Sequence, residues 1–182
     1  MIPILLKILK TGIVTETSPE AREEWRARAA RIDDEIVKLL GRALVIRHVD
    51  AGSCNGCELE LHALNNPYYN IEGLGIRFAA SPRHADMLLV TGPVSKHMEA
   101  ALRIAYEAMP APKLVVAVGD CGRDGGIWGE SYATCGGVAS VIPVDVAVPG
   151  CPPPPAAILQ GILTAISTRA APAAAHAASA PL

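Results

Sequence analysis

The 182-residue chain lacks the features that mark several large classes of protein. Its net charge is −2, so it has no basic excess with which to neutralise nucleic-acid phosphates. No apolar run is long enough to cross a bilayer. Five cysteines are too few for a disulfide scaffold. Aromatic residues make up only 4%, so a core must be built from Ala, Val, Ile and Leu.

The usual motifs of nucleotide binding are also missing. The glycine-rich stretch 119–137 contains no GxxxxGK and is therefore not a P-loop. No GxGxxG opens a helix after the first predicted strand, and no phosphate-binding loop begins there. A flavodoxin-like FMN site thus has only the predicted fold in its favour.

The N-terminal part, residues 1–42, is expected to be a helical extension. Residues 1–14 are mostly apolar and predict a short amphipathic segment that lies on a membrane surface, docks into a partner or packs on its own domain. No cationic region precedes this stretch and no small-residue cleavage site follows it, so we do not expect a secretory signal. Ser18-Pro19-Glu20 then predicts the start of a helix that ends near Gly41.

From residue 43 the pattern predicts an α/β domain. Short β-type runs alternate with helical segments, and continuously apolar runs are typical of parallel strands with both faces covered. We therefore predict a flavodoxin-like, doubly wound parallel sheet over residues 43–168 and a disordered Ala/Pro tail over residues 169–182. The expected strands are 43–49, 76–80, 87–91, 113–119 and 144–148, and the expected helices are 58–65, 96–109 and 156–167.

Four cysteines follow the ends of these strands. Cys54 and Cys57 come after strand 43–49, Cys121 after strand 113–119, and Cys151 after strand 144–148. The carboxyl ends of parallel strands share one edge of a sheet, so we expect the four thiols to meet there. Four thiolates are the ligand set of a [4Fe–4S] cluster or of a structural zinc. One close pair and two distant single cysteines suit a cluster better than zinc, which more often uses two close pairs.

The other polar residues of these segments have less defined roles. Cys135 lies inside the glycine-rich stretch, and we expect it to be a buried or idle thiol. The alternative is that Cys135 replaces Cys121 as a ligand. Glu58 and Glu60 follow Cys57, where a carboxylate could tune a redox centre or relay protons, or simply stabilise a helix start. No nucleophile–base arrangement is visible, so we do not expect the isolated chain to catalyse a reaction.

Three segments together resemble the proximal-cluster motifs of small [NiFe]-hydrogenase subunits. They are Ser53–Glu60 (SCNGCELE), Gly119–Cys121 (GDC) and Pro149–Pro153 (PGCPP). The resemblance is narrowest to the membrane-bound, energy-converting type of formate hydrogenlyase and carbon-monoxide-linked complexes, which is homologous to the 20 kDa subunit of respiratory complex I. It extends over roughly residues 43–167.

The resemblance implies that Cys54, Cys57, Cys121 and Cys151 ligate one [4Fe–4S] cluster, and that Glu60 occupies an acidic position shared with the complex I subunit. It implies an electron-transfer role between a ferredoxin-like subunit and the NiFe site of a large subunit. It also implies integral membrane subunits in the same complex and a place on the cytoplasmic face of the membrane.

The sequence departs from two related groups. Complex I subunits carry adjacent cysteines at the first motif, whereas this chain has Cys54 and Cys57, which favours the hydrogenase branch. Periplasmic uptake hydrogenases carry a twin-arginine leader and further cysteines, and this chain shows neither. A quinone-linked or nickel-free complex and a structural zinc module remain the alternatives.

Overall fold

The computed structural model describes residues 6, 7, 9, 10, 27, 36 and 41–177, and the side chains as far as residue 168. The chain divides into two compact units, Met1–Arg31 and Ile32–Leu182, and the second contains the described domain. Most of the predicted N-terminal segment 1–14 and of the helix expected from Ser18 to Gly41 lies outside the described residues. Within the described part of the chain, no helix combines the length and apolarity that a membrane span requires.

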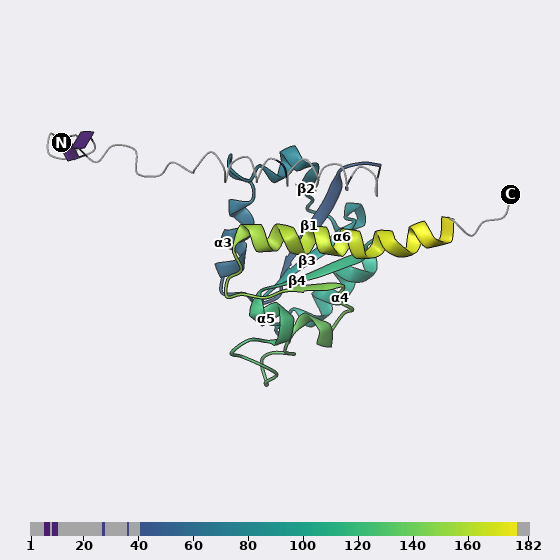
Figure 1. Cartoon of the computed structure of the whole chain (residues 1–182). Helices are drawn as coiled ribbons and strands as arrows, with labels where there is room; N and C mark the ends of the chain where they lie inside the picture. The colour runs from purple at the N-terminus through teal and green to yellow at the C-terminus, as the bar shows by residue number, and fades with distance from the viewer. Residues whose placement is uncertain (1–5, 8, 11–26, 28–35, 37–40, 178–182) are drawn as a thin grey trace. The chain divides into compact units, whose positions relative to one another are not determined.

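The domain is built on a parallel sheet of five strands (Figure 1). The strands are β1 (Leu44–Asp50), β2 (Ile76–Phe78), β3 (Met87–Thr91), β4 (Leu114–Val118) and β5 (Val146–Val148). Their spatial order is β2-β1-β3-β4-β5, and every neighbouring pair is parallel. This is the strand order of flavodoxin-like sheets. The predicted doubly wound α/β fold is therefore confirmed.

Strands β3 and β4 have the burial that is typical of inner strands of a parallel sheet. All five residues of β3 and all five of β4 are buried, as the continuously apolar sequences predict. Alternate residues face opposite sides. Leu88, Val90, Val115 and Ala117 join the core cluster that contains Leu102, and this cluster covers one side of the sheet.

Within residues 41–177, four α-helices connect or flank the strands: α3 (Gly56–Ala63), α4 (Glu99–Ala108), α5 (Gly119–Asp124) and α6 (Pro155–Ala177). Helix α6 packs on β4, β5 and α3, and Figure 1 shows it lying across the sheet. Three 3₁₀ turns complete the domain: η1 (Ile71–Leu74), η2 (Pro82–His84) and η3 (Val138–Ser140).

Most predicted boundaries differ from the structure by a few residues, and two of the differences change how an element is described. The strand expected over 113–119 ends at Val118, because Gly119 adopts a positive φ of 85° and begins the short helix α5. Helix α6 does not end near Ser167 but continues to Ala177, so residues 169–177 of the predicted disordered tail are helical. Alanine has the highest helix propensity, which explains how the helix continues without an amphipathic pattern. Residues 178–182 lie outside the described part.

Candidate metal centre

One cavity lies at the carboxyl edge of the sheet. The loops after β1, β3, β4 and β5 enclose it, and its volume is about 530 Å³. The point between β1 and β3 is where the strand order reverses, which is the usual ligand site of open α/β sheets. Its lining includes Cys54, Cys57, Cys121 and Cys151, together with Ser53, Gly92, Pro93, Asp120, Arg123, Asp124 and Trp128.

The structure thus brings together all four cysteines that the sequence singled out. Cys57 is buried, Cys121 is half-buried, and Cys54 and Cys151 are exposed. The four thiols are close enough to influence one another electrostatically. Within the described part of the chain, no three His, Cys, Asp or Glu side chains converge as closely as a single metal ion would require.

Local turns at the end of β1 place Cys54 and Cys57. One carboxylate oxygen of Asp50 accepts hydrogen bonds from the backbone N–H of Gly52 (2.8 Å) and of Ser53 (2.7 Å), which closes a tight turn. Asn55 then adopts a left-handed conformation, with φ 73°, and helix α3 begins at Gly56. Cys54 therefore lies in the turn and Cys57 in the first turn of the helix, and both line the cavity.

Two glycines keep space free beside the sulfur atoms. A Cβ on Gly119 would lie 2.7 Å from Sγ of Cys57, and one on Gly126 would lie 3.0 Å from Sγ of Cys121. Both positions also have a positive φ, so any other residue would be strained there as well as crowded. This combination of four thiols and open space beside two of them fits a thiolate-bound inorganic group.

Burial and negative neighbours raise the pKa of two of these thiols. Burial, with smaller contributions from Glu58 and the other three thiols, raises the pKa of Cys57 to about 12. Burial likewise raises the pKa of Cys121, with added contributions from Cys151 and Cys54. A cation that binds here must therefore displace protons, as is usual for thiolate sites.

A buried glutamate lies directly beside the cavity, and the sequence alone did not distinguish it from its neighbour. Glu58 is 6% exposed, whereas Glu60 is half-exposed and does not line the cavity. The hydroxyl of Ser53 donates to Oε2 of Glu58 at 2.8 Å. Oε1 has no hydrogen-bond partner and lies 3.7 Å from Nε2 of His48. Its position directly after Cys57 is the only sequence feature that separates Glu58 from Glu60.

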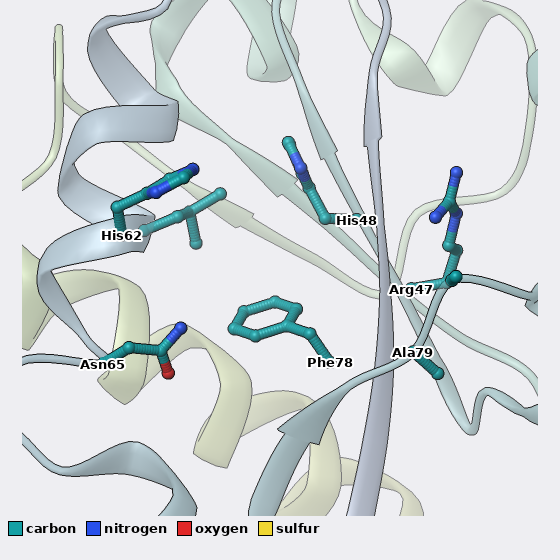
Figure 2. Close-up of a pocket in the computed structure, with 8 residues that line it drawn as sticks. Arg47, His48, His62, Asn65, Phe78 and Ala79 are labelled. Atoms are coloured by element: carbon teal, nitrogen blue, oxygen red, sulfur yellow. The ribbon is translucent and has the colours of Figure 1, made fainter.

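His48 connects this glutamate to a second pocket of about 360 Å³ (Figure 2). Its Nε2 is 2.9 Å from Oγ1 of Thr91, and burial lowers its pKa. His62 and Phe78 also line the pocket. In Figure 2, Arg47 and His48 project from opposite sides of β1, and both residues line the pocket. The pocket is separate from the one lined by the cysteines.

Cys135 does not lie in either pocket. It is 9% exposed, belongs to the core cluster packed around Leu102, and its Sγ is 3.4 Å from Oε2 of Glu99 on α4. Its location agrees with the prediction of a buried thiol away from the other four.

Fold and site together define a flavodoxin-like α/β domain with four cysteines around one cavity at its sheet edge. Residues 54–165 match the family described as NADH ubiquinone oxidoreductase, 20 kDa subunit, and the chain belongs to this family. The resemblance inferred from the three cysteine motifs is thereby confirmed.

Two similar proteins carry functional names. The chain is 44% identical to the probable membrane-bound hydrogenase subunit mbhJ of Pyrococcus furiosus, over 78% of this chain and 84% of that protein. It is 42% identical to formate hydrogenlyase subunit 7 of Escherichia coli, over 75% of this chain but only 54% of that protein. Both are subunits of oxidoreductase complexes by name, as expected from the sequence.

Two solved structures are similar in fold. A chain of the membrane-bound sulfane sulfur reductase, an archaeal respiratory membrane complex, is 33% identical, with a TM-score of 0.62 over 75% of each chain. A chain of an NAD+-reducing [NiFe]-hydrogenase is 19% identical, with a TM-score of 0.52 over 67% of this chain and 92% of that one. The second similarity supports the fold alone.

Proposed function

We propose that the chain is the electron-transfer subunit of a membrane-bound hydrogenase complex and carries one [4Fe–4S] cluster. The observation that supports it best is the single cavity lined by Cys54, Cys57, Cys121 and Cys151, which come from three separate strand ends. These four residues would hold the cluster as thiolates. When bound, such a cluster accepts and donates one electron at a time.

The arrangement of the thiols favours a cluster over zinc. A structural zinc draws four sulfurs to about 2.3 Å from one point. Among the described residues, no three of these thiols converge as closely as a single metal ion requires, which suits four thiolates that each bind a different iron. A zinc scaffold remains the contrasting proposal, and zinc is redox-silent.

The protein residues contribute binding and electrostatics. The Asp50 turn orients Cys54, helix α3 orients Cys57, and the glycines leave room at two sulfurs. Exposed Ile127 and Trp128 border the cavity and Tyr132 follows in the same loop, so these side chains are available to a partner. Glu60 remains a candidate for proton or redox tuning.

The relatives' names support the proposed assembly. We infer partners of three kinds: a large [NiFe] hydrogenase-like subunit, a ferredoxin-like [4Fe–4S] subunit, and integral membrane subunits. The chain would lie peripherally on the cytoplasmic face and link the ferredoxin-like subunit to the NiFe site. The equivalent role in a quinone-linked or nickel-free complex is the second candidate, because the family is described by a quinone reductase subunit. Two CxxC pairs in the partner large subunit would favour the hydrogenase.

The test is anaerobic EPR of the purified full chain after dithionite reduction, with iron and zinc measured on the same sample. An S = 1/2 iron–sulfur signal with about four irons per chain is expected for a [4Fe–4S] cluster. Silence with one zinc per chain would overturn the proposal. If neither metal is present, the same measurement on the intact complex decides the question.

A set of single substitutions tests the ligands. Four variants should each lose or convert the cluster, because each change removes a thiolate: Cys54→Ser, Cys57→Ser, Cys121→Ser and Cys151→Ser. Cys135→Ser is the matched control and should keep the full iron content. An intact cluster in Cys151→Ser together with a lost cluster in Cys135→Ser would reverse the assignment.

A further inference from the structure

Asp120 and Gly150, which each precede a candidate ligand, are joined by two hydrogen bonds. The backbone N–H of Asp120 donates to the carbonyl of Gly150 at 2.8 Å, and the backbone N–H of Gly150 donates to Oδ1 of Asp120 at 3.1 Å. Asp120 comes directly before Cys121 and Gly150 directly before Cys151. This pair of hydrogen bonds therefore joins the start of α5 to the loop after β5, the two segments that each supply one thiol.

The same carboxylate also holds an arginine. Nη1 of Arg123 lies 3.1 Å from Oδ1 of Asp120, and Nη2 lies 2.7 Å from Oδ2 of Asp124. Asp124 is fixed in turn, because its Oδ1 accepts the backbone N–H of Gly126 at 2.9 Å. Among the described residues that line the cavity, Arg123 is the only cation, and Asp120 and Asp124 are the only carboxylates.

From this geometry we infer that Asp120 and Arg123 act on the metal group in two ways, an inference that rests on the proposed function. Asp120 is a positioning residue that fixes the backbone of Cys121 relative to that of Cys151. Arg123, anchored by Asp120, stabilises the reduced state of the group and so raises its reduction potential.

The electrostatic effect follows from charge. Reduction adds one electron to the bound group and forms no bond, so the group becomes more negative. A nearby cation favours that state, and charge is one of the factors that set the potential of an iron–sulfur cluster. The Arg123 side chain is 44% exposed, so solvent reduces the effect but does not change its direction. Without the guanidinium, two carboxylates would face the group with no compensating charge.

The experiment separates position from charge with four variants of the full chain. Arg123→Gln removes the charge and Arg123→Lys keeps it. Asp120→Asn keeps an oxygen that can accept the Gly150 N–H, and Asp120→Ala removes it. Arg103→Gln is the matched control, because Arg103 on α4 is a similarly exposed, ion-paired arginine that does not line the cavity. Each protein is measured for iron content and by an EPR-monitored redox titration with dithionite as the reductant.

We expect the midpoint potential of Arg123→Gln to shift to more negative values, while Arg123→Lys and Arg103→Gln stay near the wild type. Asp120→Asn should keep its iron, because its amide oxygen can still accept the Gly150 N–H. Asp120→Ala should lose iron. An unchanged potential in Arg123→Gln, or full iron in Asp120→Ala, would overturn the inference. A wild-type chain that holds one zinc and gives no iron–sulfur signal would instead remove the proposed function, and this inference with it.

Discussion

Cys57 differs from the exposed thiols of the cavity in a way that can be measured on the metal-free chain. Its pKa is raised to about 12, first by burial and then by Glu58 and the neighbouring thiols. Only the thiolate reacts with alkylating agents, so Cys57 should react much more slowly with iodoacetamide at pH 8 than the exposed Cys54. Peptide mass spectrometry over time measures both rates in one sample. Equal rates at the two positions would contradict the assigned burial.

His48 gives the stability of the domain a pH dependence with a defined sign. Burial lowers its pKa from the ordinary value of 6.5, although Glu58 and Asp50 act in the opposite direction. Near pH 6 the unfolded chain therefore binds more protons than the folded chain, so stability rises with pH. This contribution is complete above 6.5 and is lost as the pH falls through the lowered pKa.

Replacing the imidazole should remove that dependence. In His48→Gln, the free energy of unfolding from urea denaturation should vary less with pH below 6.5 than in the wild type. His97→Gln changes an exposed histidine of the same domain and is the matched control. If His48→Gln keeps the wild-type pH profile, the pKa of His48 does not differ between the folded and the unfolded chain.

At the scale of elements, helix α4 offers a direct test of the core. Leu102 is fully buried in the cluster between α4 and the sheet, whereas Ile104 of the same helix is 66% exposed. Leu102→Ala should lower the free energy of unfolding by about 2–5 kcal/mol through lost transfer energy and a cavity. Ile104→Ala should change it by about 0.5 kcal/mol or less. Urea denaturation of both variants measures the difference, and equal losses would refute the described packing.

The elements that the sequence predicted well are those with a strong periodic or continuous apolar pattern. Strands β3 and β4 follow from their unbroken apolar runs, and α4 from its amphipathic pattern. Helix α5 was missed because it has only six residues, two of them glycine, and its sequence GDCGRD has low helix propensity. Its end is fixed by the left-handed Gly125, which is a signal too weak to use alone in a glycine-rich stretch.

The sequence predicted which cysteines line the candidate site, but not the hydrogen bonds and the buried carboxylate around them. The cysteines follow parallel strands, so topology alone brings them to one edge. The contact of Asp120 with Gly150 joins residues 30 positions apart, and the burial of Glu58 rather than Glu60 depends on how α3 rotates against the sheet. Such features depend on tertiary packing, which local sequence patterns do not encode.

For the molecule as a whole, the N-terminal segment 1–14 provides a test of association. Within it, Leu6 and Leu9 are helical and at least 60% exposed, so they are available for contact with a membrane or another subunit. Deleting residues 1–14 should reduce the fraction of the chain that copurifies with membranes, while the iron content stays unchanged. Fractionation and iron analysis of the same preparation measure both, and unchanged copurification would indicate that the segment only packs locally.

The contribution of three separate strand ends to one cavity also has a consequence for biosynthesis. Cys54 and Cys57 leave the ribosome long before Cys151, and the cavity cannot exist until β5 has joined the sheet. A group held by all four thiols, as proposed above, can therefore be bound only by a nearly finished chain.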